Sequence, residues 1–201
     1  MTTRQIVGDL SGLPASGWGT KSQWFWGILG FMAIEGMGFL LAMGCYLYLM
    51  SQAASWPLRG SPPDLLYGSL LTVVMLLSLL PNAWVARVAS QKKLGPTLTG
   101  LVVMSLIAVA CLAIRAFEFQ HLETRWDSDA YGSIVWALLL LHTTHLVTDF
   151  IDTVVLAVFC FTHEVDEERF SDVDTNAVYW GFVVAAWLPI YALVYWAPRL
   201  R

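Results

Sequence analysis

Charged residues are scarce in this sequence of 201 residues, and their scarcity excludes most classes of soluble protein. Asp, Glu, Lys and Arg make up 13% of the chain, whereas soluble globular domains carry about 25%. Hydrophobic residues make up 57%, which also excludes intrinsic disorder. The net charge is −4, and the 11 basic residues form no cluster of the kind that binds nucleic acid. The class that remains is an integral membrane protein.

Cysteine is almost absent, and so are the short motifs of soluble enzymes. The three cysteines, Cys45, Cys111 and Cys160, stand far apart inside apolar runs, so we expect buried small side chains and no disulfide framework. The sequence has no phosphate-binding loop, no dinucleotide-binding glycine pattern, no nucleophile elbow and no CxxC pair. The chemistry of the chain therefore depends on the few polar residues that interrupt its apolar runs.

Five apolar runs are each long enough to cross a bilayer, which takes about 20 residues. They cover residues 24–49, 65–89, 97–119, 131–161 and 176–196. Short connections that are proline-rich, basic or acidic separate these runs. We therefore predict an all-α integral membrane fold, a bundle of five transmembrane helices within residues 24–201. Residues 1–23 are predicted to form an N-terminal cytoplasmic tail, since they lack a signal-peptide pattern.

The basic residues favour a cytoplasmic N-terminus. Five spans place the two ends on opposite sides of the membrane. The N-terminal side receives Arg4, Lys21, Arg87, Lys92, Lys93 and Arg169, and the other side receives Arg59, Arg125, Arg199 and Arg201, with Arg115 near the boundary. The positive-inside rule thus predicts a periplasmic or external C-terminus, and we expect the membrane to be the bacterial inner membrane. Tryptophans near the predicted span ends are expected at the lipid–water interface, namely Trp24, Trp26, Trp56, Trp126 and Trp196.

Glu35 interrupts the first apolar run near its middle, where a charge costs at least about 2.5 kcal/mol. Gly38, Ala42 and Cys45 share its helical face, and small residues permit close helix packing. We expect the carboxyl to point into a helix seam. It is either a protonated group that makes a structural hydrogen bond or a proton-active, regulatory group.

The fourth run contains His142, His145, Asp149 and Asp152, and this spacing places all four on one helical face. Such a stripe cannot face lipid, so an interhelical hydrogen-bond network is predicted. A non-haem metal held by the two histidines and carboxylates is an alternative, and haem ligation is another. The run has no third histidine and no Glu-x-x-His element to support either.

Arg115 and Glu118 stand three residues apart near the end of the third run and are expected to pair. Alternatively, Arg115 contacts a lipid phosphate. Together with Arg59 and Arg125 it is predicted to form a lipid-binding set on the non-cytoplasmic side. We expect ordered phospholipid in a groove between the first two spans and the last three.

Four segments, in order and in spacing, resemble the five-helix form of subunit III of the haem–copper cytochrome c oxidases. They are residues 26–35 (WGILGFMAIE, resembling WG-x-x-x-F-x-x-x-E), 115–119 (RAFEF, resembling Q-x-x-E-Y), 131–145 (YGS…HTTH, resembling YGS…HG-x-HV) and 176–187 (NAVYWGFVVAAW, resembling WYWHFVD-x-x-W).

The sequence departs from the family pattern at four positions. Asp149 replaces a small residue, Arg115 replaces a glutamine, and Gly181 and Val184 stand where the family has His and Asp. The longer form of subunit III also has two further N-terminal helices that open a lipid-filled cleft. A chain like the shorter form is expected to form its cleft differently or with another subunit.

The resemblance implies a non-redox accessory subunit with no catalytic residue, metal or redox cofactor on this chain. Its expected partners are the catalytic oxidase subunit I and other oxidase subunits, which hold the haem and copper, and membrane phospholipid. Expected roles are support of assembly, proton uptake and lipid binding in aerobic respiration. By this resemblance, the polar network, either structural or proton-active, consists of Glu35, Glu118, His142 and His145, with His142 or His145 as the expected partner of Glu35. Asp149 and Asp152 are additions of this chain.

Three other functions stay open at this stage. The chain could be the subunit-III-like protein of a nitric oxide reductase, which shares the five-helix plan. It could be a stand-alone membrane enzyme with a metal on the His/Asp stripe of the fourth run. A proton-coupled transporter predicts inverted repeats and broken helices, and the sequence shows neither.

Overall fold

Five long helices form the part of the chain that the structure describes, as predicted. The computed structural model describes residues 23–58, 61–163 and 167–200. The helices are α1 (Gln23–Gln52), α2 (Leu65–Ser90), α3 (Leu94–Gln120), α4 (Ala130–Thr162) and α5 (Glu167–Tyr191), which continues through the π-helical turn η1 (Ala192–Trp196) into α6 (Ala197–Leu200). Five helical segments are long and apolar enough to cross a membrane, the last running from Phe170 to Leu200. The predicted N-terminal tail and Arg59 lie outside the described residues.

The fifth helix begins nine residues earlier than predicted, at Glu167 instead of residue 176. The acidic stretch before residue 176 is too polar for lipid, and its polarity predicts a connection between spans. Polarity excludes a segment from lipid but does not exclude a helix, and acidic side chains favour the N-terminal turns of a helix. Near its other end, α5 contains Pro189, which lacks an N–H for the helical ladder, and the π-helical turn follows directly.

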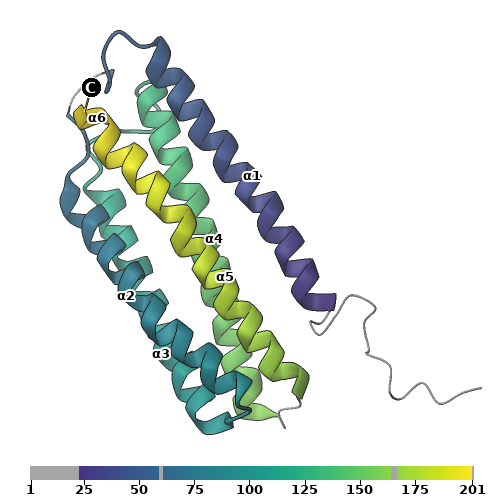
Figure 1. Cartoon of the computed structure of the whole chain (residues 1–201). Coiled ribbons are helices and arrows are strands. Elements are labelled where there is room, and N and C mark those ends of the chain that lie inside the picture. The colour runs from purple at the N-terminus through teal and green to yellow at the C-terminus, as the bar shows by residue number, and fades with distance from the viewer. Residues whose placement is uncertain (1–22, 59–60, 164–166, 201) are drawn as a thin grey trace, which may run out of the picture.

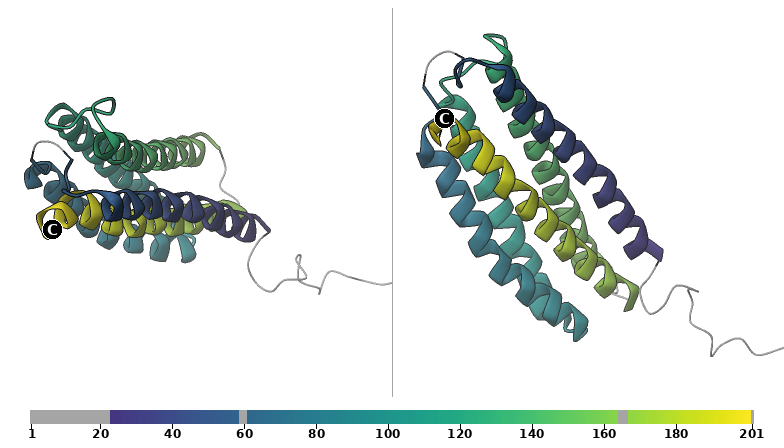
Figure 2. Two further views of the ribbon diagram at one scale, coloured as in Figure 1. Left: turned by 90° about the horizontal axis from the view of Figure 1, so that it is seen from above. Right: turned by 45° about the horizontal axis from the view of Figure 1, so that its top comes forward.

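The helices pack in two groups that meet at α5 (Figure 1). α2 packs on α3 and α5, whereas α1 packs on α4 and α5. α3 and α4 also lie side by side, so α1 and α2 stand on opposite sides of the bundle (Figure 2). One end of the bundle holds the α2–α3 turn with Lys92, and we call it the Lys92 end. The opposite end, which holds the α1–α2 connection, is the Trp56 end.

This arrangement corrects the predicted lipid groove. We expected a groove between the first two spans and the last three, but α1 and α2 do not form a pair. The polar side chains of α1 and those of α2 bind to different sides of α5. α5 therefore lies between α1 and α2. The groove that the structure does form lies between α1, α4 and α5.

Four direct hydrogen bonds join α2 to α5 along their antiparallel contact. Each involves a small polar residue of α2, and each lies between 2.7 and 2.8 Å. The pairs are Ser69–Tyr191, Thr72–Trp187, Ser78–Trp180 and Asn82 with the Ala177 carbonyl oxygen. In lipid these groups have no water to bind, so the pairs fix the register of the two helices.

α1 contributes least to the core. Of its described side chains only Phe39 and Tyr46 are buried. Cys45 is exposed, contrary to our expectation, while Cys111 and Cys160 are buried as expected. α1 is thus a peripheral helix held along one side.

Of the tryptophans expected at the lipid–water interface, three are exposed and one is buried, and the side chain of Trp24 lies outside the described residues. Trp26, Trp126 and Trp196 are exposed near the ends of the bundle. Trp56 is instead buried, because its indole N–H donates to the Tyr46 hydroxyl at 2.8 Å and its ring packs edge-on against Tyr131.

A glycine tests the α2–α5 contact. A Cβ added at Gly68 would lie 2.5 to 2.9 Å from three ring atoms of Tyr195, which is fully buried. We expect Gly68→Ala to lower stability by about 1–3 kcal/mol through overpacking. Gly30→Ala on α1 is the matched control, since nothing lies within 4 Å of its added Cβ. Thermal melts of the purified variants in detergent measure both. Equal melting temperatures would contradict this packing.

Candidate functional site

Arg115 and Glu118 form a buried ion pair, as their spacing predicted. The guanidinium Nη1 lies 2.8 Å from Glu118 Oε2, and the two residues are 1% and 3% exposed. The Tyr195 hydroxyl donates to the other Glu118 oxygen, and the guanidinium stacks 4.3 Å above the Trp187 ring. The pair thus joins α3 to α5 inside the bundle. The burial gives no support to a lipid-phosphate contact for Arg115.

His142 is held as a neutral side chain between this ion pair and α5. Its Nε2 lies 3.1 Å from the Val183 carbonyl oxygen, which can only accept, so Nε2 carries the proton. Its Nδ1 lies 3.1 Å from Arg115 Nη2, which can only donate, so Nδ1 accepts. Both nitrogens are therefore occupied. His142 belongs to the Arg115 cluster and not to Glu35.

Glu35 binds to His145, one of the two histidines predicted for it, and also to Tyr179. His145 Nε2 lies 3.2 Å from Glu35 Oε1. The Tyr179 hydroxyl lies 3.1 and 2.9 Å from the two carboxyl oxygens and donates to them. The Glu35 and His145 side chains are 13% and 10% exposed. This Glu35 cluster joins α1, α4 and α5.

The hydrogen bonds fix how many protons the Glu35 cluster holds. His145 Nδ1 lies 2.7 Å from the Leu141 carbonyl oxygen, so Nδ1 carries a proton. The contact between Nε2 and Glu35 needs one more proton, which belongs either to the imidazole or to the carboxyl. In both forms the pair of side chains has no net charge. The pair can therefore shift one proton without placing a net charge in the membrane.

The two histidines thus have different partners, and this corrects the metal alternative. His142 faces a cation, and His145 faces one carboxyl group. Among the described residues no three His, Cys, Asp or Glu side chains come together to hold a metal ion. The hypothesis of a metal enzyme built on this helix has no geometric support.

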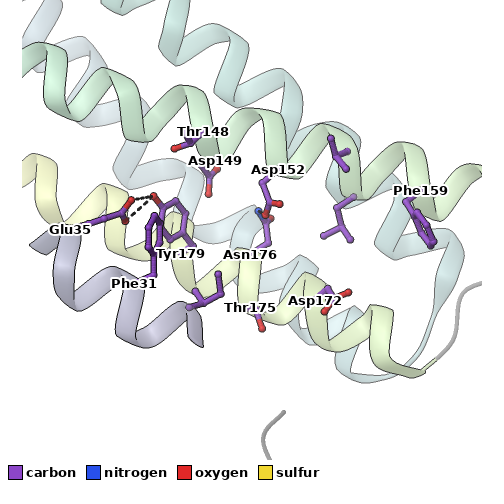
Figure 3. A pocket seen from close by; sticks show the side chains of 13 residues that line it. Phe31, Glu35, Thr148, Asp149, Asp152, Phe159, Asp172, Thr175, Asn176 and Tyr179 are labelled. Atoms are coloured by element: carbon purple, nitrogen blue, oxygen red, sulfur yellow. Dashed lines mark hydrogen bonds between the residues drawn. The ribbon is translucent and has the colours of Figure 1, made fainter. Parts of the chain in front are cut away.

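A pocket of about 630 Å³ opens beside the Glu35 cluster, between α1, α4 and α5. Figure 3 shows Glu35 and Tyr179 at one end of the pocket, with Asp149 and Asp152 projecting into it from α4. Asp152 accepts a hydrogen bond from Asn176 at 3.1 Å. The pocket continues to Asp172 near the start of α5, toward the Lys92 end.

The predicted stripe on α4 is therefore split between two environments. His142, His145 and Asp149 are buried, as a common face requires. Asp152, the last member, is exposed to the pocket because it lies at the edge of that face. Thr153, one residue later, takes the buried position beside Asn176.

Arg125, a predicted lipid contact, lies in the α3–α4 connection at the Trp56 end. Its exposed guanidinium binds both carboxyl oxygens of Asp127, at 3.0 and 3.1 Å. This hydrogen bonding raises the pKa of Arg125 and lowers the pKa of Asp127. Nothing in the structure tests its contact with lipid.

Sequence reasoning missed the α5 partners of the predicted residues. Tyr179, Tyr195 and Asn176 complete the polar clusters, and Thr148 and Asp172 line the pocket. A signal was present, since Tyr179 and Asn176 lie within the last segment that carried the family resemblance. An isolated tyrosine in an apolar run does not reveal which helix it faces.

The Arg115 cluster generates a stability prediction. Arg115→Leu leaves the Glu118 carboxyl buried without its cation, and breaking a buried pair in this way costs about 3–5 kcal/mol. Arg115→Leu with Glu118→Gln removes both charges and should recover most of that loss. Thermal melts in detergent measure the difference. Arg125→Leu, which breaks an exposed pair, is the control and should change the melting temperature little. A double variant no more stable than the single one would refute a coupled pair.

Comparisons with known proteins agree with this architecture. Residues 41–198 match the family model of cytochrome c oxidase subunit III. Glu35 lies just before the matched region. Cytochrome c oxidase subunit 3 of Schizophyllum commune is 24% identical over 179 residues, which cover 84% of this chain and 66% of that protein. The Chondrus crispus protein of that name is 21% identical over 145 residues, 70% of this chain and 53% of that protein.

A cyanobacterial relative shows the same level of similarity. Cytochrome c oxidase subunit 3 of Synechocystis sp. is 22% identical over 174 residues, 84% of this chain and 73% of that protein. The chain spans only 53% and 56% of the length of the relatives from Chondrus crispus and Rhipicephalus sanguineus. With five membrane-spanning helices and a family match over most of its length, this integral membrane protein belongs to the cytochrome c oxidase subunit III family.

Proposed function

We propose that the chain is an accessory subunit of a haem–copper cytochrome c oxidase and carries no redox centre itself. Its membership of the subunit III family carries this proposal. Haem and copper would then reside in partner subunits, the catalytic subunit I among them. The two histidines of α4 are occupied by Arg115 and Glu35, which agrees with a structural and proton-handling role rather than redox chemistry.

The surface for the catalytic subunit is not marked by unpaired polar groups. We expected the polar stripes of α1 and α4 to be hidden by a partner or within the bundle itself, and α5 supplies hydrogen bonds to Glu35, His142 and Asp152 but none to Asp149 Oδ1. The peripheral helix α1 turns most of its large apolar side chains outward. Association would therefore depend on apolar packing between helices, as is usual within a bilayer.

We propose that the Glu35 cluster and the pocket support proton uptake. The Glu35–His145 pair shifts a proton at no cost in net charge, and the carboxyl groups of Asp149, Asp152 and Asp172 follow it along the pocket. This line leads to the Lys92 end. The basic residues at that end support a cytoplasmic orientation, with the C-terminus on the periplasmic side of a bacterial inner membrane.

We also propose that the chain binds phospholipid. Arg125, with Arg59 outside the described residues, provides cationic groups near the Trp56 end for anionic head groups. Exposed apolar side chains on every long helix provide the surface for acyl chains.

Gentle extraction tests the subunit assignment. We expect the full chain, affinity-purified in mild detergent from its own membrane, to bring larger subunits with haem absorbance and copper, and native mass spectrometry to find retained phospholipid. A mock purification from cells without the tag is the control. A chain that elutes alone, folded and without haem-bearing partners, would contradict the proposal.

Glu35 variants separate a proton-active role from a structural role. Glu35→Gln keeps hydrogen bonds to Tyr179 and His145 but removes the exchangeable proton, whereas Glu35→Ala removes both and leaves a cavity. If the cluster supplies protons, Glu35→Gln oxidase assembles normally but loses turnover sooner as pH rises, when protons are scarce. Turnover time courses from pH 6 to 9, with subunit content checked at each step, measure this. Wild-type turnover by Glu35→Gln would assign the cluster a structural role, and wild-type assembly and turnover by Glu35→Ala would refute both roles.

A further inference from the structure

The pocket between α1, α4 and α5 has a marked excess of negative charge. Four carboxylate residues line it, Glu35, Asp149, Asp152 and Asp172, and no Lys, Arg or His among the described residues does. Glu35 is balanced within its own cluster by His145. The charge balance beside the Glu35 cluster therefore depends on Asp149 and Asp152, and a positively charged occupant suits this pair best.

Asp149 provides a second, independent observation. The residue is 1% exposed, and its Oδ1 atom has no hydrogen-bond partner among the described residues. Figure 3 shows its side chain projecting from α4 into the pocket, between Glu35 and Asp152. A buried carboxylate oxygen without a donor is costly, and a donor within the pocket would remove that cost.

Most of the remaining lining is apolar or aromatic, and Thr148, Thr175 and Asn176 are its polar members. The apolar side chains include Ile28 and Phe31 of α1 and Val155, Leu156 and Phe159 of α4. Phe31 and Val155 are both more than half exposed, so the rim on both sides is apolar and turned toward lipid. A ligand that enters between α1 and α4 would therefore meet apolar side chains first and carboxylates deeper inside.

We propose that this pocket binds an organic ammonium group carried on an apolar body. The ammonium donates N–H bonds to Asp149 and Asp152, and the apolar body lies over Phe31 and Val155. The ammonium group can belong to an aminophospholipid of the membrane or to a free lipophilic amine. A volume of about 630 Å³ is sufficient for a head group with part of a chain.

The geometry favours an ammonium over a metal cation. The carboxylates are spread along the pocket, and no three of the described His, Cys, Asp and Glu side chains converge on one point. An ammonium with several N–H donors can bind two separated carboxylates, and aromatic rings at Phe31 and Tyr179 add cation–π contacts.

Binding of a defined probe tests the proposal. The full chain is purified in an uncharged detergent, and dodecylamine is titrated while the melting temperature and the dissociation constant are measured. Dodecanol is the uncharged control ligand. Asp149→Asn keeps the shape of the side chain but removes its charge, and Asp127→Asn, in the α3–α4 connection, is the matched control variant. Since loss of a charge-assisted hydrogen bond weakens binding by about tenfold or more, this shift is expected for Asp149→Asn alone.

Asp152→Asn provides a second variant, since its amide oxygen still accepts from Asn176, and it should weaken binding in the same direction. Equal affinity of wild type and Asp149→Asn, or equal effects of dodecanol and dodecylamine, would overturn the proposal.

The source of the ammonium is tested in a second arm. Native mass spectrometry of the chain extracted from Escherichia coli membranes compares retained phosphatidylethanolamine with phosphatidylglycerol. Phosphatidylethanolamine that is lost from Asp149→Asn identifies the lipid as the source. Retention of neither lipid, together with tight dodecylamine binding, identifies a free amine. Both arms use the isolated chain, so their result is independent of its place in an oxidase.

Discussion

Each of the other four long helices makes a side-chain hydrogen bond to α5 or to the π-helical turn η1 that continues it, and this constraint determines the fold. The Tyr179 hydroxyl donates a hydrogen bond to Glu35 of α1, and the Tyr195 hydroxyl donates one to Glu118 of α3. His142 of α4 binds the Val183 carbonyl oxygen. The four hydrogen bonds between α2 and α5 described above hold α2. In hydrocarbon a polar group has no alternative partner, so each of these contacts excludes other arrangements of the helices. α5 is therefore the element around which the other four are placed.

The two polar clusters differ in what they can do, although both contain a carboxylate and a histidine. The Arg115 cluster is closed, because His142 has both nitrogens engaged and Glu118 binds Arg115 and Tyr195. The Glu35 cluster lies beside a pocket and contains a proton that two groups share. The same residue types thus stabilise the bundle in the Arg115 cluster and are available for proton exchange or ligand contact in the Glu35 cluster.

The sequence was sufficient to predict five long helices and most of their bounds, and it singled out the charged residues that interrupt them. Length and apolar character mark a membrane span directly, and an interrupting charge such as Arg115 or Glu35 stands out against it. The pairing of spans was not predictable, because a polar face shows that a partner exists but not which helix supplies it. This explains why the groove was placed between the wrong helices, and why Tyr179 was overlooked as the partner of Glu35.

The distance along the chain between Glu35 and its partners has a consequence for biogenesis. Tyr179 follows Glu35 by 144 residues, so α1 enters the bilayer long before the group that binds its carboxyl is synthesised. Until the last helix is inserted, Glu35 lacks Tyr179, Glu118 lacks Tyr195, and the polar residues of α2 lack their α5 partners. A chain that stops before α5 would thus leave these polar groups with fewer hydrogen bonds than in the folded subunit. Completion of the last helix is the step that converts a set of separate insertions into one folded subunit.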